Sequence, residues 1–309
     1  VALVYKNFPK IIYWFSIIAF VTILIVIFDA IFQYIFSYNI LGYERKHETR
    51  VSGFFQDKYV LGSFIIRIMP ISLIFIFFKN NNFDNLKNKF LIVAYFSLIA
   101  IGVILSGERT ALIYLITISF LFILIFYYLR RFFFLILLFF LTIFIGLIFY
   151  DKDIKQRFLD TTIAELGLNN NKFKINIFSE VHQQFYSTSF LIFKDNIIFG
   201  AGPNTYRKKC EERRYFFQKE ENNKLIKVCA THPHNSYIQL LAETGILGFI
   251  IILFLFILII FKLINFFIKS KHLNNIDIIQ VLLLMSCFVS LFPFVPNGNF
   301  FNSWLNSLY

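Results

Sequence analysis

The sequence predicts an all-α protein, a polytopic bundle of transmembrane helices. Of the 309 residues 58% are hydrophobic, 45 residues are Phe, and the mean hydropathy is +0.68. Apolar runs long enough to cross a bilayer, about 17–25 residues, recur along the chain. In lipid such runs must be helical, because a helix satisfies its own backbone hydrogen bonds.

About seven full spans and a partial one are expected. They cover residues 11–29, 59–78, 90–106, 111–128, 133–150, 245–263 and 274–293. The chain opens with Val1 rather than Met, and it ends at Tyr309 where another apolar segment begins. We therefore expect a single membrane domain over 1–309 that is a fragment of a longer protein.

Basic residues predict the orientation of these spans. Four clusters flank them: Lys6 and Lys10; Lys79, Lys87 and Lys89; Arg130 and Arg131; and Lys262, Lys269 and Lys271. All four fall on one side if every span crosses, and an excess of Lys and Arg marks the cytoplasmic side. The loop 30–58, the turn 106–110 and the long loop 151–244 then face outward. We expect 151–244 to form a subdomain, because connections this long are usually functional or structured, and 180–193 has the pattern of a helix.

The net charge of +12 does not indicate a nucleic-acid partner, because no basic stretch interleaved with aromatic residues forms a soluble module. Positive-inside bias accounts for much of this charge. The rest lies in the long loop, where Arg207 is a candidate for contact with substrate or anionic lipid. We read no Asp-x-Asp or Glu-rich pair on the outward side as a divalent-metal glycosyltransferase site, and the chain carries no Walker-type loop. We therefore expect no metal, no cofactor and no use of ATP.

The densest group of polar residues, 231–248, lies where the long loop re-enters the membrane. His234 can accept a proton near neutral pH from a hydroxyl placed beside it. Asn235 suits the N-cap of the following helix and is also a candidate for substrate binding. The alternative is that His234 only caps or hydrogen-bonds at the interface, and the local sequence does not choose between the two interpretations.

Three arginines are candidates for binding an anionic substrate, because a guanidinium forks onto phosphate oxygens. Arg109 lies in the turn 106–110 and Arg50 in the loop 30–58, and for both the alternative is snorkelling to the interface. Arg67 falls about 12 Å inside the second span, where charges are costly and usually have a partner. For Arg67, substrate contact and a structural ion pair with Asp29 are both open.

Two cysteines lie in the long outward loop. An oxidising compartment favours a disulfide between Cys210 and Cys229. The competing interpretation is a zinc site, since His232 and His234 would complete four ligands. Crowding around the intervening proline and the oxidising compartment favour the disulfide. Cys287, in the last full span, is expected to be a packing residue.

These residues together resemble the O-antigen ligase and polymerase superfamily. The pattern His234-Asn235, nine residues, Gly245, two residues, Gly248 is similar to the ligase signature. Three further segments resemble family blocks: Ser106 to Thr110, Ile198 to Pro203, and Asp29 to Tyr34. The blocks occur in order and extend over most of the chain.

The resemblance implies a GT-C-like fold in the bacterial inner membrane, with an active site that faces the periplasm. It implies a metal-independent, inverting enzyme that takes a glycan from undecaprenyl pyrophosphate. The acceptor is a sugar hydroxyl, either on the lipid A core (a ligase) or on another lipid-linked repeat (a polymerase), and the sequence does not decide between them. The family's essential histidine corresponds to His234 and its essential arginines to Arg109 and Arg50. The resemblance also leads us to expect that a full-length member has further spans before and after this chain.

The rival function of a different class is a flippase for the same lipid-linked glycan. Such transporters tend to have inverted repeats and helices broken near the midplane. The sequence shows no repeat, and a flippase has little need of a long outer loop. A membrane scaffold is a third possibility, and it leaves the ordered Arg and His residues unexplained.

Overall fold

The computed structural model describes residues 9–79, 86–165, 178–215, 217–221 and 224–301. The chain divides into two compact units, and each is described by itself. They are Val1–Asp160 with Ile259–Val289, and Thr161–Leu258 with Ser290–Tyr309. The described residues are largely helical, as the sequence predicts, but they also contain a two-stranded hairpin that the all-α prediction missed.

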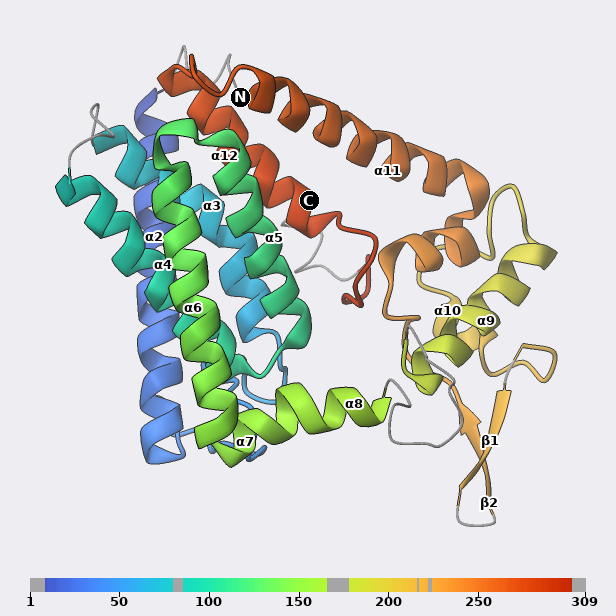
Figure 1. Ribbon diagram of the computed structural model, residues 1–309. Helices are drawn as coiled ribbons and strands as arrows, with labels where there is room; N and C mark the ends of the chain where they lie inside the picture. The colour runs from blue at the N-terminus through green and yellow to red at the C-terminus, as the bar shows by residue number, and fades with distance from the viewer. Residues whose placement is uncertain (1–8, 80–85, 166–177, 216, 222–223, 302–309) are drawn as a thin grey trace. The chain divides into compact units, whose positions relative to one another are not determined.

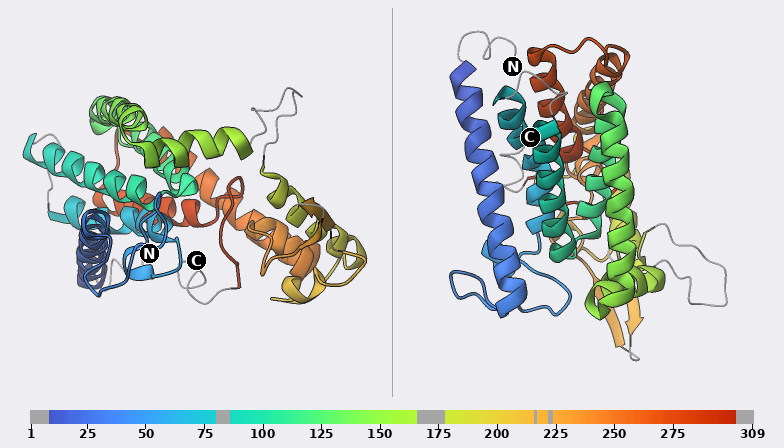
Figure 2. Two further views of the ribbon diagram at one scale, coloured as in Figure 1. Left: turned by 90° about the horizontal axis from the view of Figure 1, so that it is seen from below. Right: turned by 60° about the vertical axis from the view of Figure 1, so that its left-hand side comes forward.

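Long apolar helices make up most of the first unit; in Figure 1 α2 to α6 are coloured blue to green and α12 orange-red. They are α2 (Pro9–Phe36), α3 (Leu61–Lys79), α4 (Leu86–Ser106), α5 (Arg109–Ile125) and α6 (Arg130–Tyr150), with most of α12 (Asn275–Ser290). Helix α2 packs against α3 and α4, and α5 packs against α6 (Figure 2). Branched side chains such as Ile23, Ile27, Ile65 and Leu73 are fully buried between them.

Four described helices are long and apolar enough to cross a membrane by length and composition. They cover Lys10–Phe36, Lys89–Ser106, Tyr127–Tyr150 and Ser236–Ile268. Three shorter apolar helices cover Leu61–Phe77, Arg109–Ile125 and Asn275–Ser290. Each predicted span falls on one of these seven helices. That all seven cross the membrane stays a prediction. The partial span predicted near the end falls on residues 302–309, outside the described residues.

The loop between α2 and α3 is anchored by polar side chains from α2. The Gln33 side-chain oxygen accepts the backbone N–H groups of Ser52 and Gly53, at 3.1 and 2.7 Å. The Asp29 carboxylate accepts the N–H of Ile40 at 3.0 Å and the Asn39 amide at 3.4 Å. The loop is therefore fixed to the end of α2, and this positions the arginines that it carries.

The ion pair considered for Arg67 and Asp29 is not formed. Asp29 is occupied by the loop, since it receives hydrogen bonds from Ile40 and Asn39. The Arg67 guanidinium instead lies 5.8 Å from the ring centroid of Tyr114, within reach of a cation–π contact. Its buried Nε has no hydrogen-bond partner within the described part of the chain.

A short helical segment follows α6 and completes one end of the first unit. Asp151 caps α7 (Lys152–Lys155) by accepting the N–H groups of Asp153 and Ile154. The Tyr34 hydroxyl donates to the Asp151 carboxylate at 2.9 Å, which ties α7 to α2. The π-helical turn η3 (Gln156–Asp160) continues from α7 and carries Arg157.

The second unit combines short helices, the hairpin and the first part of a long helix. Its elements are α8 (Thr161–Glu165), α9 (Glu180–Asp195), α10 (Tyr206–Lys209), β1 (Phe217–Glu221), β2 (Lys224–Val228) and most of α11 (Ser236–Ile268). The helix predicted over 180–193 is confirmed. Strands β1 and β2 pair antiparallel. A small core of Ile192, Tyr206, Cys210, Tyr215 and Ala242 joins α9, α10 and α11.

Candidate active site

The turn between α4 and α5 contains a buried carboxylate. Glu108 is 6% exposed and accepts the backbone N–H groups of Gly62 and Ser63, at 2.7 and 3.3 Å. These N–H groups belong to the first turn of α3, where no intrahelical partner exists, so Glu108 serves as a cap for a neighbouring helix. Burial raises the pKa of the Glu108 carboxyl, and the hydrogen bonds from Ser63 and Gly62 oppose that shift. The turn is thereby attached to α3, and Arg109 begins α5 at a fixed place.

Arg50 packs beside this turn. Its Nε donates to the carbonyl oxygen of Ser106 at 3.4 Å and its Nη2 to that of Tyr59 at 3.3 Å. The guanidinium carbon lies 4.3 Å from the Tyr59 ring centroid. Burial lowers the pKa of the Arg50 guanidinium from its usual value; the charges of Glu108 and Tyr59 oppose this and that of Arg109 adds to it. The two sequence-predicted arginines, Arg50 and Arg109, therefore lie within electrostatic range of each other.

Two further arginines, which no sequence pattern singled out, lie at the same end of the first unit. Arg157 donates from Nε to the carbonyl oxygen of Gly107 at 2.8 Å. Arg45 lies 3.8 Å from the Asp153 carboxylate and over the Tyr34 ring. Arg157 is one of several basic residues in its segment, and only the π turn after α7 brings it to the turn at Gly107.

We call Arg45, Arg50, Arg109 and Arg157 the arginine cluster. Three of its members act on His47, whose pKa is lowered first by burial and then by the charges of Arg50, Arg157 and Arg45. Guanidinium groups gathered in this way suit phosphate oxygens, which they bind through paired hydrogen bonds. The N-terminal end of α5 adds a partial positive charge of its own.

In the second unit, the backbone around His234 is held in an uncommon conformation. His234 has φ +58°, a value that favours glycine, so neighbouring contacts must maintain it. Its carbonyl oxygen accepts the N–H of Asn297 at 2.9 Å. The Asn297 side-chain oxygen in turn accepts the N–H of Ser236 at 2.9 Å and the Ser236 hydroxyl at 3.0 Å. The segment after α12, 291–301, which we call the tail, therefore holds the backbone at His234 in place.

Asn235 caps α11, as its place in the sequence predicts. Its side-chain oxygen accepts the N–H groups of Tyr237 and Ile238, at 3.0 and 3.1 Å. Its amide nitrogen donates to the carbonyl oxygen of Pro293 at 2.8 Å. Asn235 is 4% exposed and uses both ends of its side chain, so the structure gives it a structural role and leaves substrate contact a proposal.

Three imidazoles gather at this point, a group we call the histidine cluster: His182, His232 and His234. The ring centroid of His234 lies 4.1 Å from that of His232 and 5.5 Å from that of His182. Burial lowers the pKa of His234 to about 4, and the neighbouring charges of His232 and His182 contribute to the shift. His234 is therefore neutral at pH 7 and can accept a proton or a hydrogen bond. His182 comes from α9, and no pattern in the sequence pairs it with His234.

The first glycine of the His-Asn pattern, Gly245, lies at a kink where α11 meets the segment 198–202. Gly245 has φ +65° inside α11, and a Cβ there would lie 2.4 Å from the carbonyl oxygen of Ile198. A Cβ on Gly200 would lie 2.3 Å from the carbonyl carbon of Glu243. Backbone hydrogen bonds join the segments, from the N–H of Ala201 to Ala242 and from that of Gly202 to Glu243, each 2.9 Å long. Both glycines are needed because the two backbones touch.

Glu243 organises the turn before α10 from inside this contact. It is 1% exposed, and its carboxylate accepts the N–H groups of Tyr206 and Asn204, at 2.7 and 3.0 Å. The amide of Gln239 also donates to it at 3.0 Å, and to the Asn299 side chain at 2.6 Å. One buried carboxylate thus links α11, the turn before α10 and the tail.

The O-antigen ligase family matches this chain over residues 94–253. The chain belongs to the O-antigen ligase family. Among curated proteins, none matches it. Its membership of this family and its apolar helices together indicate a membrane protein with a role in glycan processing, of ligase or glycosyltransferase type.

In this O-antigen ligase family member, the matched segment runs from α4 into α11. It includes Arg109 and Arg157 of the arginine cluster and all three members of the histidine cluster. Arg50 and Arg45 precede the segment. The family match therefore includes residues of both units, with part of the arginine cluster and the whole histidine cluster.

The remaining sequence-predicted residues have separate places in the two units. Cys210 and Cys229 form a disulfide with Cα atoms 5.6 Å apart, so neither thiol is free to bind zinc. Arg207 is exposed on α10. Arg67 is buried within the first unit and lies over Tyr114.

Proposed function

We propose that this O-antigen ligase family member transfers a glycan from undecaprenyl pyrophosphate to a sugar hydroxyl on a lipid A core or on another lipid-linked repeat. The observation that supports this most directly is the histidine cluster, in which His234 is held neutral at the start of α11 inside the family-matched segment. A neutral imidazole accepts a hydrogen bond from a hydroxyl, which a protonated one does not.

In the proposed reaction, His234 orients the acceptor hydroxyl and takes its proton. The hydroxyl oxygen attacks the anomeric carbon of the donor from the face opposite the pyrophosphate, so the configuration inverts. A pKa of about 4 makes His234 a weak base, and its proton uptake then accompanies formation of the new glycosidic bond. His182 and His232 have a supporting role: their rings lie against the His234 ring and would hold it in place.

The arginine cluster is assigned to the leaving group. As the bond from the anomeric carbon to the phosphate oxygen breaks, its electron pair stays on that oxygen and undecaprenyl pyrophosphate leaves. Arg109 and Arg50 would neutralise the growing negative charge, with Arg45 and Arg157 contributing to the field. Because guanidinium groups supply positive charge directly, the proposal is of a metal-independent enzyme. Arg67 and Arg207 are proposed only as further contacts of the substrate.

The membrane orientation is also part of the proposal. Arg130 and Lys271, from two of the predicted cytoplasmic clusters, meet over the ring of Tyr127 at the end of the first unit where α5 ends and α6 begins. The arginine cluster lies at the other end of these helices. Positive-inside bias would then put the Tyr127 end in the cytoplasm and the arginine cluster at the periplasmic face of the bacterial inner membrane.

The test is glycan transfer from a lipid-linked donor by purified protein in detergent. His234→Ala and Arg109→Ala are each expected to lower the rate by about a hundredfold or more. The matched controls are His272→Ala and Arg131→Ala, exposed residues of the same types, which should leave the rate unchanged. Full transfer by correctly folded His234→Ala and Arg109→Ala proteins would show that the mechanism is wrong.

The assay in detergent also distinguishes transfer from translocation. Detergent micelles offer no two compartments between which a flippase could move a lipid, and a flippase forms no new glycosidic bond. Loss of the protein in cells then separates the two acceptors. If all long chains disappear from lipid A, the protein is a ligase; if a single repeat remains attached, it is a polymerase.

A further inference from the structure

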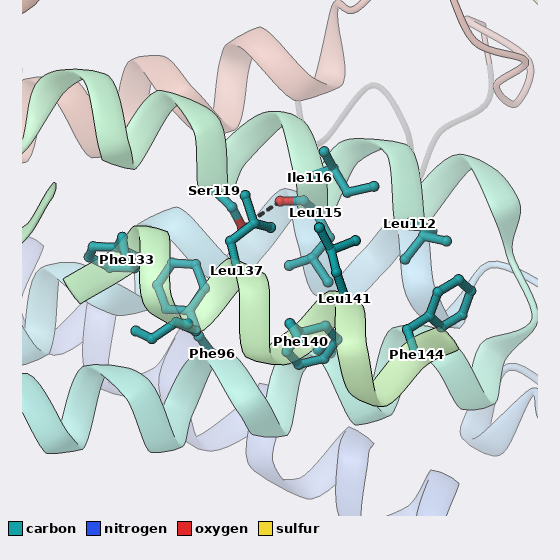
Figure 3. Close-up of a pocket in the computed structure, with 12 residues that line it drawn as sticks. Phe96, Leu112, Leu115, Ile116, Ser119, Phe133, Leu137, Phe140, Leu141 and Phe144 are labelled. Carbon is teal, nitrogen blue, oxygen red and sulfur yellow. Dashed lines mark hydrogen bonds between the residues drawn. The ribbon is translucent and has the colours of Figure 1, made fainter. Parts of the chain in front are cut away.

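An apolar crevice runs along α5 and α6, with α4 forming part of its wall (Figure 3). Its volume is about 80 Å³. Of its lining residues, all in the described part of the chain, only Ser119 has a polar side chain, and the Ser119 hydroxyl donates to the carbonyl oxygen of Leu115 at 2.8 Å. The crevice therefore presents almost no hydrogen-bonding group to an occupant, and this suits a hydrocarbon.

The crevice is elongated and has two distinct ends. In Figure 3 the side chains of Phe133, Phe96 and Ser119 lie at one end, and those of Leu112 and Phe144 at the other. Phe133 and Phe144 are eleven positions apart on α6, which corresponds to about 16 Å along the helix axis. A slender, flexible chain fits such a crevice better than a compact ring.

One end of the crevice lies next to the arginine cluster. Leu112 is three residues, less than one helical turn, beyond Arg109 on α5. Phe144 makes an edge-to-face contact with Phe158, at a centroid distance of 5.3 Å, and Phe158 directly follows Arg157. A molecule with a phosphate at the cluster would thus have its next atoms at the mouth of a crevice that accepts only hydrocarbon.

We propose that this crevice holds the first isoprene units of the polyprenyl chain of the lipid-linked donor. The inference rests on the proposed function, since it takes a polyprenyl pyrophosphate as the donor. Positive charge at one end and an apolar channel leading from it match the two chemical parts of that molecule. The branched methyl groups of a polyprenyl chain suit a wall of Leu, Ile and Phe side chains, which leave gaps between them.

The test compares two adjacent leucines of α6. Leu137 lines the crevice and is half-buried, whereas Leu138 does not line it and is 44% exposed. Binding of undecaprenyl pyrophosphate and of inorganic pyrophosphate is measured on the full chain in detergent. Leu137→Trp fills the crevice and should weaken binding of the lipid by about tenfold while binding of inorganic pyrophosphate is unchanged. Leu138→Trp should change neither.

The outcomes separate this inference from the proposed function. If the wild-type protein binds undecaprenyl pyrophosphate and the two Trp variants bind it equally well, the crevice does not hold the chain although the function stands. If the wild-type protein binds neither probe, the proposed function itself is contradicted. If dioleoylphosphatidylglycerol displaces undecaprenyl pyrophosphate at equal concentration, the crevice is a site for any lipid chain, and the inference is again overturned.

A second measurement needs no substitution and so does not depend on a variant that folds. A polyprenyl pyrophosphate that carries a photoreactive diazirine in its first isoprene units is bound to the wild-type protein and irradiated. Crosslinks within 112–119 and 133–144 support the inference. Crosslinks confined to other helices would overturn it.

Discussion

The Nε of Arg157 donates a hydrogen bond to the carbonyl oxygen of Gly107, 2.8 Å away and fifty positions earlier in the chain. This bond joins the π turn after α7 to the turn that starts α5. It brings a basic residue from the segment after α6 into the arginine cluster, beside Arg50 and Arg109.

Removal of Arg157 should weaken the cluster. Arg157→Ala is expected to lower glycan transfer by about tenfold to a hundredfold, because a hydrogen bond from a charged group contributes about 1.5–3 kcal/mol. The rate of transfer from lipid-linked donor measures this effect, and Arg131→Ala is the control, since Arg131 is exposed at the other end of α6. An equal loss in both variants would mean that only overall charge matters.

Gly107 should not tolerate a side chain. It has φ +62°, and a Cβ would lie 2.7 Å from the carbonyl oxygen of Thr49 and 2.8 Å from Cγ of Arg50. Gly107→Ala is expected to reduce the free energy of unfolding by about 1–2 kcal/mol or more, from backbone strain alone. Thermal unfolding of the purified protein measures it. Gly146→Ala is the matched control, because a Cβ at Gly146 in α6 meets nothing within 4 Å and Ala favours a helix over Gly; a lower melting temperature for that variant would contradict this account.

The histidine cluster predicts how transfer depends on pH. Because the pKa of His234 is lowered to about 4, the base should stay neutral as the pH falls from 7 to 5, and kcat/KM should decline only near pH 4. His232→Asn removes a neighbouring imidazole that contributes to lowering the pKa of His234, so the acid limb should move toward higher pH. An acid limb near pH 6.5, the ordinary value for histidine, would contradict the arrangement.

The same shift predicts acid destabilisation of the second unit. Between about pH 4 and 6.5 the unfolded chain binds a proton at residue 234 that the folded chain does not bind, so stability rises with pH in this window. The contribution is complete above about pH 6.5 and is lost as the pH falls toward 4. Chemical denaturation at several pH values measures this, and in His234→Gln the slope over this window should be smaller.

Asn235 should matter for stability through its cap. Asn235→Ala removes the acceptor for the N–H groups of Tyr237 and Ile238 and should cost about 0.5–2 kcal/mol. Asn235→Ser keeps a capping oxygen and should recover much of that loss in thermal unfolding. If Asn235→Ser is as stable as the wild type but transfers no glycan, Asn235 also contacts substrate.

The helices were predictable because lipid leaves the backbone little choice. Each predicted span falls on an apolar helix, and the helix over 180–193 is confirmed. The ends of the spans were predicted less accurately. The first span was predicted to end at residue 29, whereas α2 continues to Phe36, and its last turns carry Asp29 and Gln33, which anchor the following loop. The hairpin β1–β2 was missed, because its residues carry no strong alternation of apolar and polar side chains.

By itself the sequence determined the membrane class and the family, and it singled out His234, Asn235, Arg50 and Arg109 as candidates, because apolar length and short motifs are local properties. Only the tertiary structure decided that Asp29 binds a loop instead of pairing with Arg67. It also decided that Arg157 belongs to the arginine cluster and His182 to the histidine cluster. Those relationships depend on contacts between residues far apart in the chain. The direction of an imidazole or a guanidinium follows from such contacts, and no spacing along one segment encodes it.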